Sequence, residues 1–508
     1  MGSTFMGLET ARRGLTTQQS ALYTTGHNIS NANTVGYSRQ RVNMEATLGY
    51  PGTGLNAPKI AGHLGTGVQA GSVQRIRDQF IDRQYRQEST KLGYWETRSN
   101  AISQVEDIVT EPSEYGLNSA IDQFWNSLQD LSGSPENAAT RKVVVQRALH
   151  LADSFNYTNK QLSDIQGNIG NEIKVSTDDI NSMLKQIASL NEQIQAVEPN
   201  GYMPNDLYDA RDSLIDELSQ YFPIEIEKVP SGGNALAIAE GGLNISIKLA
   251  DGSKIELVKG KDFAQLETMD TSNNKLDGID LTSGFNEIKI TGLSGGTISY
   301  NQLAPSKGKL ASLIDSFGHG NPPSGYFTDT LAKLDKMANA FIKEFNELHK
   351  KGFTLAEGAT VSTNNQEFFT GIGASGIEVL KDIIDNPNLI AVSDAQGEAG
   401  NGKNAIKLAN MKFNKLTDLD GATVQSFYQG VIGQLGVDGE QANRLTTNAG
   451  TILLTVANNR ASVSSVSLDE EMTNMITFQQ AYNANARMIT VVDETLDKII
   501  NGMGRVGL

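Results

Sequence analysis

Three glycines, Gly371, Gly373 and Gly376, have the GxGxxG spacing of a dinucleotide-binding loop, in the stretch GIGASG. Such a loop binds a pyrophosphate when it follows a buried strand and opens a helix, because glycine lets the backbone N–H groups approach the phosphates. The preceding stretch, NNQEFF at 364–369, is too polar for a buried parallel strand. We therefore interpret these glycines as an ordinary loop. A secreted enzyme with a nucleotide-binding insertion stays open as an alternative function.

Other residues that could do chemistry form no recognisable site. The chain has no cysteine, which excludes disulfides, thiolate metal sites and thiol nucleophiles. Its histidines lack the paired spacing of metal ligands, so we expect surface or capping roles for them. The five are His27, His63, His150, His319 and His349. Four aspartates, Asp206, Asp209, Asp212 and Asp216, are interpreted as one solvated helix face. The sequence thus predicts no catalytic residue, no cofactor and no metal.

Charge and hydropathy exclude further classes of protein. In 508 residues, 42 Lys and Arg stand against 58 Asp and Glu, a net charge of -16 that disfavours nucleic-acid binding. The basic residues gather early, where the first hundred residues carry more Lys and Arg than acids. A run of about 18 apolar residues, as a membrane span needs, does not occur. The opening residues also lack the pattern of a cleaved signal peptide. We expect no nucleic-acid or membrane partner.

The two chain ends carry the strongest periodic patterns. Leu8, Leu15, Leu22 and Ile29 recur every seven residues, as in a coiled coil. The closing stretch repeats apolar or small residues every three or four positions, at Leu468, Met472, Met475, Phe478, Tyr482, Ala486, Ile489, Val492, Leu496, Ile499 and Met503. One isolated helix of this kind cannot offset its ordering entropy, and two paired helices still leave apolar surface open. We expect the ends to pair with each other and to need neighbouring chains.

Antiparallel pairing of the ends has an electrostatic consequence that can be tested. It would bring Arg12 and Arg13 near Asp493, Glu494 and Asp497, and we predict ion pairs between them. The closing stretch also carries the amides Gln479, Gln480, Asn483 and Asn485. These amides either fix the register between helices or face solvent, and the sequence leaves both open.

The interior alternates between helical and strand-like periodicity, which predicts a mainly α fold with β insertions, an α+β multidomain chain. A terminal coiled-coil domain would comprise 1–40 with 468–508. A helical rod would comprise 41–222, 304–352 and 421–467, including one helix of some sixty residues between Pro135 and Pro199. A β-rich outer domain would span 223–303, where apolar residues alternate with polar ones. A small mixed insertion would span 353–420.

Two terminal motifs resemble a known family. TFMGLETA at 4–11 and GHNISNANTVGYSRQ at 26–40 resemble the N-terminal signature of bacterial flagellar rod, hook and hook-associated proteins. FQQAYNANAR at 478–487 is similar to the C-terminal signature of that family. LYDARDSLIDEL at 207–218 and FIKEFN at 341–346 resemble internal segments of its members at the junction of hook and filament. Another hook-side or filament-side axial subunit is the alternative within the family.

The resemblance implies a structural, non-enzymatic subunit, secreted through the flagellar type III apparatus to the flagellum outside the cell. Its implied partners are further copies of itself in a ring, the hook protein, a second hook-associated junction protein on the filament side, and an export chaperone that binds the C-terminal helix. The loop at 26–40 is expected to act as a hydrogen-bonded hinge that contacts a neighbouring subunit. The expected subunit-interface residues are Leu8, Leu15, Leu22, Ile29, Asn31, Asn33, Tyr37, Met475, Phe478, Tyr482, Asn483, Asn485, Ile489 and Leu496.

Overall fold

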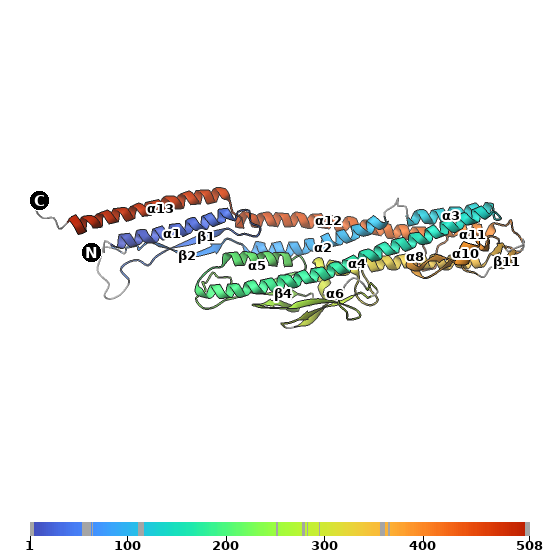
Figure 1. Cartoon of the computed structure of the whole chain (residues 1–508), viewed down its shortest axis with the longest axis horizontal. Helices are drawn as coiled ribbons and strands as arrows, with labels where there is room; N and C mark the ends of the chain where they lie inside the picture. The colour runs from blue at the N-terminus through green and yellow to red at the C-terminus, as the bar shows by residue number, and fades with distance from the viewer. Residues whose placement is uncertain are drawn as a thin grey trace.

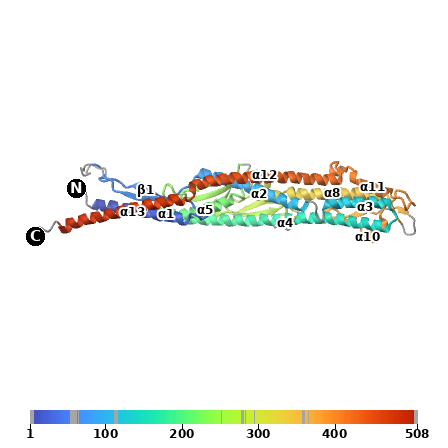
Figure 2. The same ribbon diagram turned by 90° about the horizontal axis from the view of Figure 1, so that it is seen from above.

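The computed structural model shows a long rod of helices, with both chain ends at the same extremity (Figure 1). The view from above shows the same elongated shape (Figure 2). The structure describes residues 5–52, 62, 64–109, 116–249, 252–276, 280–281, 283–293, 295–355, 361–363 and 366–502. Residues 1–4 and 503–508, which belong to the expected terminal domain, lie outside the described residues. The predicted fold class, mainly α with β insertions, is confirmed.

Four long helices run along the rod, joined by shorter ones. The long helices are α2 (Gln79–Val109), α4 (Ala138–Val197), α8 (Tyr326–Lys350) and α12 (Val424–Ser464). The shorter ones are α3 (Leu117–Gly133), α5 (Asn205–Leu218), α6 (Tyr300–Leu303), α7 (Lys309–Phe317) and α11 (Lys403–Asn410). Helix α4 has the expected length of 60 residues, and the Asn137 side chain caps its start by accepting a hydrogen bond from Ala139 N.

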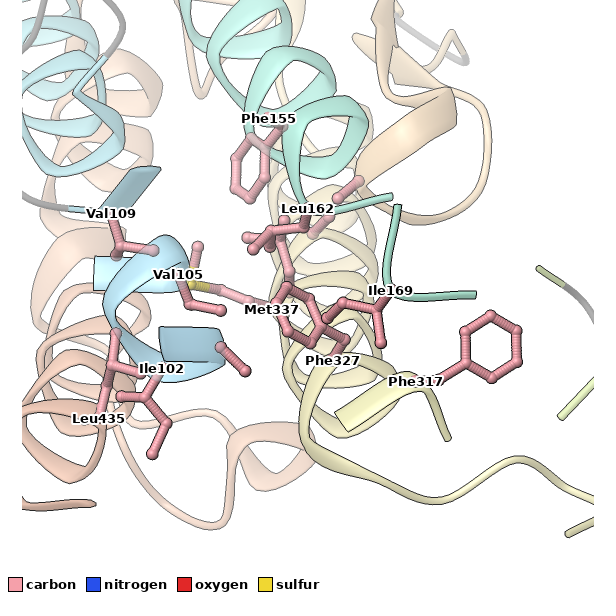
Figure 3. Packing of buried hydrophobic residues seen from close by; sticks show 14 of the residues in the cluster. Ile102, Val105, Val109, Phe155, Leu162, Ile169, Phe317, Phe327, Met337 and Leu435 are labelled. Atoms are coloured by element: carbon pink, nitrogen blue, oxygen red, sulfur yellow. The ribbon is translucent and has the colours of Figure 1, made fainter. Parts of the chain in front are cut away.

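The rod has a continuous apolar core because each long helix contributes one apolar face to it. Ile102 and Val105 of α2, Leu162 of α4 and Met337 of α8 converge in its middle (Figure 3). Leu435 of α12 packs beside Ile102 on the other side of α2. Burying each such side chain contributes about 1.5–3 kcal/mol, and the single chain completes this core by itself.

The end of the rod that lies farthest from the chain termini is filled by aromatic rings. Phe124 of α3 lies 5.4 Å from Phe345 of α8, measured between ring centroids. Phe368 and Phe369 join them, with 4.8 Å between their own ring centroids. All four side chains are fully buried. The helices and the 353–420 segment are thus held together at this end by aromatic contacts.

The expected strands between 223 and 303 form two small antiparallel sheets along one side of α4 (Figure 1). The first contains β3 (Ile224–Val229), β4 (Gly242–Lys248), β5 (Lys254–Lys259) and β6 (Asp262–Phe263); the second contains β7 (Gln265–Asp270), β8 (Phe285–Thr291) and β9 (Gly296–Ser299). Two asparagines of α4 dock one sheet each. Asn191 exchanges hydrogen bonds with the backbone of Leu243, and Asn181 does so with Leu266.

The segment 353–420 wraps the aromatic end with short elements. These are β10 (Phe353–Leu355), β11 (Val361–Thr363), β12 (Phe369–Thr370), α9 (Gly373–Gly376), β13 (Glu378–Val379) and α10 (Lys381–Asp385). The GIGASG stretch is a tight turn that leads into the four-residue helix α9, so the expected loop accounts for only its first residues. A Cβ on Gly371, whose φ is 89°, would lie 1.7 Å from the carbonyl oxygen of Gly376. The Ala374 N–H donates to Asp335 Oδ1 at 2.7 Å, so a carboxylate of α8 occupies the side where a phosphate would bind.

Candidate functional site: the terminal pair and its joint to the rod

The first and last helices lie side by side beyond the end of the rod (Figures 1 and 2). They are α1 (Phe5–Ser30) and α13 (Leu468–Asp497), which together we name the terminal pair. A Cβ built on Gly7 would meet Val492, and one built on Gly14 would lie 2.7 Å from Asn485 Oδ1. A step of seven residues along α1 therefore matches a step of seven back along α13. The expected antiparallel pairing is present, and its line of closest approach runs through glycines.

The predicted line of contact on α1 is displaced by one residue. Small or polar residues with heptad spacing, Gly14, Ala21 and Asn28, are buried. The aliphatic residues expected there come one position later, and all four are only half-buried: Leu8, Leu15, Leu22 and Ile29. Side chains without bulk let the two backbones approach closely, whereas leucines at those positions would hold the helices apart. The heptad period was therefore predicted correctly, but the residues at the α1–α13 contact were not.

Helix α13 is covered sparsely in the single chain. Glu471 is its only buried residue. The expected interface residues Met475, Phe478, Tyr482, Asn485, Ile489 and Leu496 are half-buried, and Asn483 is exposed. Met472, Ile476, Met488 and Val491 are each more than half exposed. The four amides of α13 divide between the two roles left open by the sequence. Asn485 lies against Gly14 in the contact between the helices, whereas Gln479, Gln480 and Asn483 face solvent.

The predicted ion pairs within the terminal pair are wrong. Arg12 and Arg13 both bind Glu9 of their own helix, at 2.8 and 2.9 Å. The observed register places Arg12 level with Arg487, and the three carboxylates lie six to ten residues farther along α13. Asp493, Glu494 and Asp497 are all exposed, and none forms an ion pair with a described residue. The prediction assumed the right direction of pairing but a register shifted by several residues.

The loop after α1 is organised by one buried amide, Asn28. Its Nδ2 donates to Gln40 O at 2.8 Å and to Glu471 Oε2 at 3.0 Å. Its Oδ1 accepts from Gln40 N at 3.0 Å and from the Tyr37 hydroxyl at 2.8 Å. Every hydrogen-bonding position of this side chain is thus used, which fixes the exit of α1 against both the loop and α13.

The expected interface residues of the loop have different environments. Tyr37 is half-buried, and its hydroxyl also lies 2.9 Å from His27 Nδ1. Burial and the carboxylates of Asp206 and Asp209 raise the pKa of Tyr37, so the phenol stays protonated and can donate to Asn28. Asn31 is half-buried and donates back to His27 O at 3.1 Å. Asn33 is exposed. Tyr37 and Asn31 therefore serve the loop itself, and Asn33 is free to meet a neighbour.

The far end of the loop is bound to the rod and to α13. Ser38 donates from both its backbone N and its Oγ to Asp209 of α5, at 3.0 and 2.7 Å. Arg39 reaches the start of α13, with Nε 2.8 Å from Glu471 Oε1. Gly36, at φ 82°, lies so close to α5 that a Cβ there would be 2.2 Å from Ser213 Oγ. The expected hydrogen bonds are present, and they join the loop to the rod and to α13 within one chain; contact of the loop with a neighbouring subunit stays a prediction.

Behind this joint lies a buried group of charges that we name the arginine–carboxylate cluster. Its members are Arg75, Arg77, Arg86, Arg211, Arg460, Asp82, Asp209, Asp212, Asp216 and Glu240. They come from α2, α5, α12 and strand β2 (Val68–Arg75), which pairs antiparallel with β1 (Gln40–Ala46); Arg77 lies between β2 and α2, and Glu240 just before β4. Arginines and carboxylates are equal in number, so the cluster is neutral.

The cluster corrects our interpretation of the α5 aspartates as a solvated face. Asp209 and Asp212 are buried, and Asp216 binds both Arg86 and Arg460 at 2.6 and 2.7 Å. Only Asp206 is largely exposed. The sequence signal that could have found the cluster was the early basic excess, because Arg75 and Arg77 neutralise acids that lie more than a hundred residues later.

Electrostatics favours the ionised forms of Asp212 and Arg75 in this cluster. Burial alone would raise the pKa of Asp212, but the guanidinium groups of Arg77, Arg75 and Arg86 outweigh it and hold the pKa well below its usual range. Burial would likewise lower the pKa of Arg75, and the carboxylates of Asp212, Glu240 and Asp209 raise it instead. Removing one partner would leave an uncompensated buried charge, which costs about 3–5 kcal/mol. The cluster therefore acts as a rigid clamp between strands and helices.

Neither a metal-binding cluster nor a helix that could span a membrane occurs among the described residues. Among the described residues, no group of three or more His, Asp or Glu side chains could hold a metal ion. Within the same part of the chain, no helix combines the length and the apolar character that a membrane crossing requires. What the geometry does provide is a pair of exposed helices attached through Asn28 and the charged cluster to a self-supporting rod.

Three parts of the chain match models of known flagellar protein families. Residues 102–369, more than half of the chain, match the model of the flagellar hook-associated protein FlgK helical domain. Residues 8–37 match the flagella basal body rod protein model, and 458–502 match the flagellar basal body rod FlgEFG protein C-terminal model. These two models of basal body rod proteins thus cover most of α1 and all of α13, the terminal pair. Together with the FlgK model, these matches place the chain among the structural proteins of the bacterial flagellum.

Relatives of known name specify the family. The chain is 44% identical to flagellar hook-associated protein 1 of Bacillus subtilis over 99% of both chains. It is 26% identical to flagellar hook-associated protein 1 of Escherichia coli over 97% of this chain and 99% of the relative. The solved structure of the flagellar hook junction protein FlgK from Burkholderia pseudomallei shares the fold, with a TM-score of 0.59 and 14% identity, and covers 75% of this chain and 100% of its own. The chain belongs to the flagellar hook-associated protein 1 (FlgK) family.

Proposed function

We propose that this chain is a structural subunit of the junction between the flagellar hook and the filament. The observation that carries the proposal is the full-length similarity to a relative named flagellar hook-associated protein 1. The terminal pair supports it physically. A helix with one buried residue and a row of exposed apolar side chains is suited to contacts with further chains rather than to independent stability.

The proposed assembly is a ring of identical copies, with the terminal pairs side by side. In this proposal one face of the ring binds the hook protein and the other binds a second hook-associated protein on the filament side. The chain reaches this place outside the cell through the flagellar type III apparatus, with an export chaperone that covers the α13 helix beforehand. The exposed Met472, Ile476 and Met488 give such a chaperone an apolar surface to cover.

The proposed role requires no catalysis. The one stretch with a nucleotide-binding spacing has its Ala374 N–H group directed at the carboxylate of Asp335. An anionic phosphate would have to displace that carboxylate, and a Cβ on Gly373 would already lie 2.7 Å from it. This geometry supports a purely structural subunit over a nucleotide-dependent enzyme.

Complementation tests the proposal directly. A Bacillus subtilis strain that lacks its own flagellar hook-associated protein 1 is supplied with this chain, and filaments are counted by electron microscopy. We expect hooks to acquire filaments. A variant that lacks residues 468–502 is the matched control, and it should leave the hooks bare because it has no terminal pair.

The proposal is contradicted if the full chain reaches the medium at the level of the native protein but the hooks stay bare. The positive control is the native gene, which must restore filaments in the same strain. Incorporation of the chain within the hook or within the filament, instead of between them, would favour the alternative of another axial subunit. The matches of the termini to basal body rod models are the observation that keeps this alternative in view.

A further inference from the structure

Two neighbouring arginines of α1, Arg12 and Arg13, lie outside its contact with α13. Arg12 precedes Gly14 by two residues, which is about 200° around a helix, so it lies on the side opposite the glycine that meets α13. The Arg12 side chain is 66% exposed and that of Arg13 is 37% exposed. Both line an open groove of about 770 Å³ between α1 and the start of the β1–β2 connection. We name Arg12 and Arg13 the basic face.

The basic face carries more positive charge than its neighbours neutralise. Arg12 and Arg13 share one carboxylate, that of Glu9. The other acid lining the groove, Glu45, lies against Gly71 of β2, where a Cβ would be 2.6 Å from its carboxylate. Exposed pairs such as Arg12 with Glu9 contribute little, so the arginines can take a second carboxylate at small cost.

The carboxylates near the end of α13 also face outward. Glu494 follows Val492 by two residues, so it lies on the side of α13 opposite the contact with Gly7. Asp493, Glu494 and Asp497 are exposed and form no ion pair within the described part of the chain. We name these three residues the acidic end. Within one chain, Arg12 and Glu494 lie on opposite outer sides of the terminal pair, and the register separates the acidic end from the basic face along the helices, so the two groups form no contact.

We infer that the acidic end of one copy binds the basic face of the next copy. This rests on the proposed function, because it assumes that identical chains lie side by side. Arg12 is level with Arg487 in one chain, and the acidic end lies six to ten residues farther along α13. Neighbouring copies are therefore displaced along the helices by about 9–15 Å, at 1.5 Å per residue.

This contact joins two different surfaces, so every copy offers one of each. Such head-to-tail contacts generate closed rings, or helical arrays where the rotation does not close. The exposed apolar residues Met488 and Val491 lie beside the acidic end and add apolar area to the same contact. The charges set which surfaces meet and at what displacement, and the apolar residues supply further burial.

Crosslinking between two single-cysteine variants tests the inference, and the natural absence of cysteine makes it clean. Thr16→Cys lies one turn from Arg12 and Thr490→Cys lies one turn from Glu494, both at exposed positions that leave the charges unchanged. The two variants are expressed together in cells that otherwise lack the protein. Their flagella are isolated and treated with a short bismaleimide. We expect a crosslinked dimer, absent when either variant is expressed alone.

The control replaces Thr490→Cys with Ile476→Cys, which is exposed on the same side of α13 but about 21 Å nearer the rod. This pair should give monomer only. Filaments are counted before crosslinking, so that the two proposals fail separately. Absence of filaments counts against the proposed function. The inference is wrong if filaments form but the Thr16→Cys and Thr490→Cys chains stay monomeric. It is also wrong if these chains crosslink no better than the control pair.

Discussion

The rod and the terminal pair are both built from long helices but are stabilised in different ways. In the rod, helices bury large aliphatic and aromatic residues against several others, and Phe345 touches aromatic rings from three segments. In the terminal pair, α1 buries small and polar residues and α13 buries Glu471 alone. Regular helices thus occur in both, but only the rod has a core of its own. We therefore expect substitutions in the rod to destabilise the free chain, and substitutions in the terminal pair to affect mainly the assembly.

The largest effect is expected in the aromatic end of the rod. Phe345→Ala should lower the free energy of unfolding of the purified chain by about 3–5 kcal/mol, because it leaves a cavity among fully buried rings. Phe478→Ala, at a half-buried position of α13, is the matched change in the terminal pair and should cost less than about 1 kcal/mol. Denaturant titration measures both. Equal losses would remove the distinction between the two regions.

A somewhat smaller loss is expected at the charged cluster that connects the regions. Arg75→Met removes the partner of Asp209, Asp212 and Glu240 and should cost about 3 kcal/mol, because buried carboxylates lose their counter-charge. Arg12→Met, at an exposed pair, should cost no more than about 1 kcal/mol in the same titration. If Arg75→Met were as mild as Arg12→Met, the cluster would not act as a clamp.

The rod should also be sensitive to mild acid through one histidine. His349 Nε2 accepts the Ala391 N–H at 3.0 Å, and burial lowers the pKa of His349 to about 4. The unfolded chain, with an ordinary histidine pKa near 6.5, binds this proton more readily. The contribution is therefore complete above about pH 6.5 and is lost as the pH falls towards 4, a total of about 3 kcal/mol. His349→Gln keeps the acceptor and should flatten this part of the stability profile. An unchanged profile in the variant would contradict the assignment.

The smallest effect is expected from a single methyl group at the helix contact. Gly14→Ala places a Cβ 2.7 Å from Asn485 Oδ1, so the Asn485 side chain must move away from its place between the helices; we expect this to outweigh the better helix propensity of alanine and to leave a net loss of about 1 kcal/mol or less. Gly26→Ala, with nothing within 4 Å, is the control on the same helix and should be neutral or slightly stabilising. Filament yield and thermal unfolding should therefore suffer only from Gly14→Ala. A larger loss from Gly26→Ala would mean that the small-residue line is not the contact.

The sequence predicted element types well because hydrophobic period is a local property. The 60-residue helix between Pro135 and Pro199 and the strands after Phe222 follow from it. Register between distant elements is not local. The choice of Gly14 rather than Leu15 as the contact on α1 depends on how closely two backbones approach, which one helix cannot reveal.

The candidate site was predicted unevenly for the same reason. Asn28 stands in the quoted loop motif, but its use of all four hydrogen-bonding positions requires Gln40, Tyr37 and Glu471 to be brought together by folding. The aspartates of α5 looked solvated because their arginines come from β2, α2 and α12. When ion-pair partners lie more than a hundred residues apart, the sequence shows only that one region has more basic than acidic residues.

Amide hydrogen exchange on the purified single chain, compared with the same chain in isolated flagella, tests the central claim most directly. The account predicts that α1 and α13 exchange rapidly in the free chain while α4 is strongly protected, and that the terminal helices become protected only in the assembly. If α1 and α13 of the free chain in dilute solution were as protected as α4, the terminal pair would be stable alone, and the claim that it depends on neighbouring copies would be wrong.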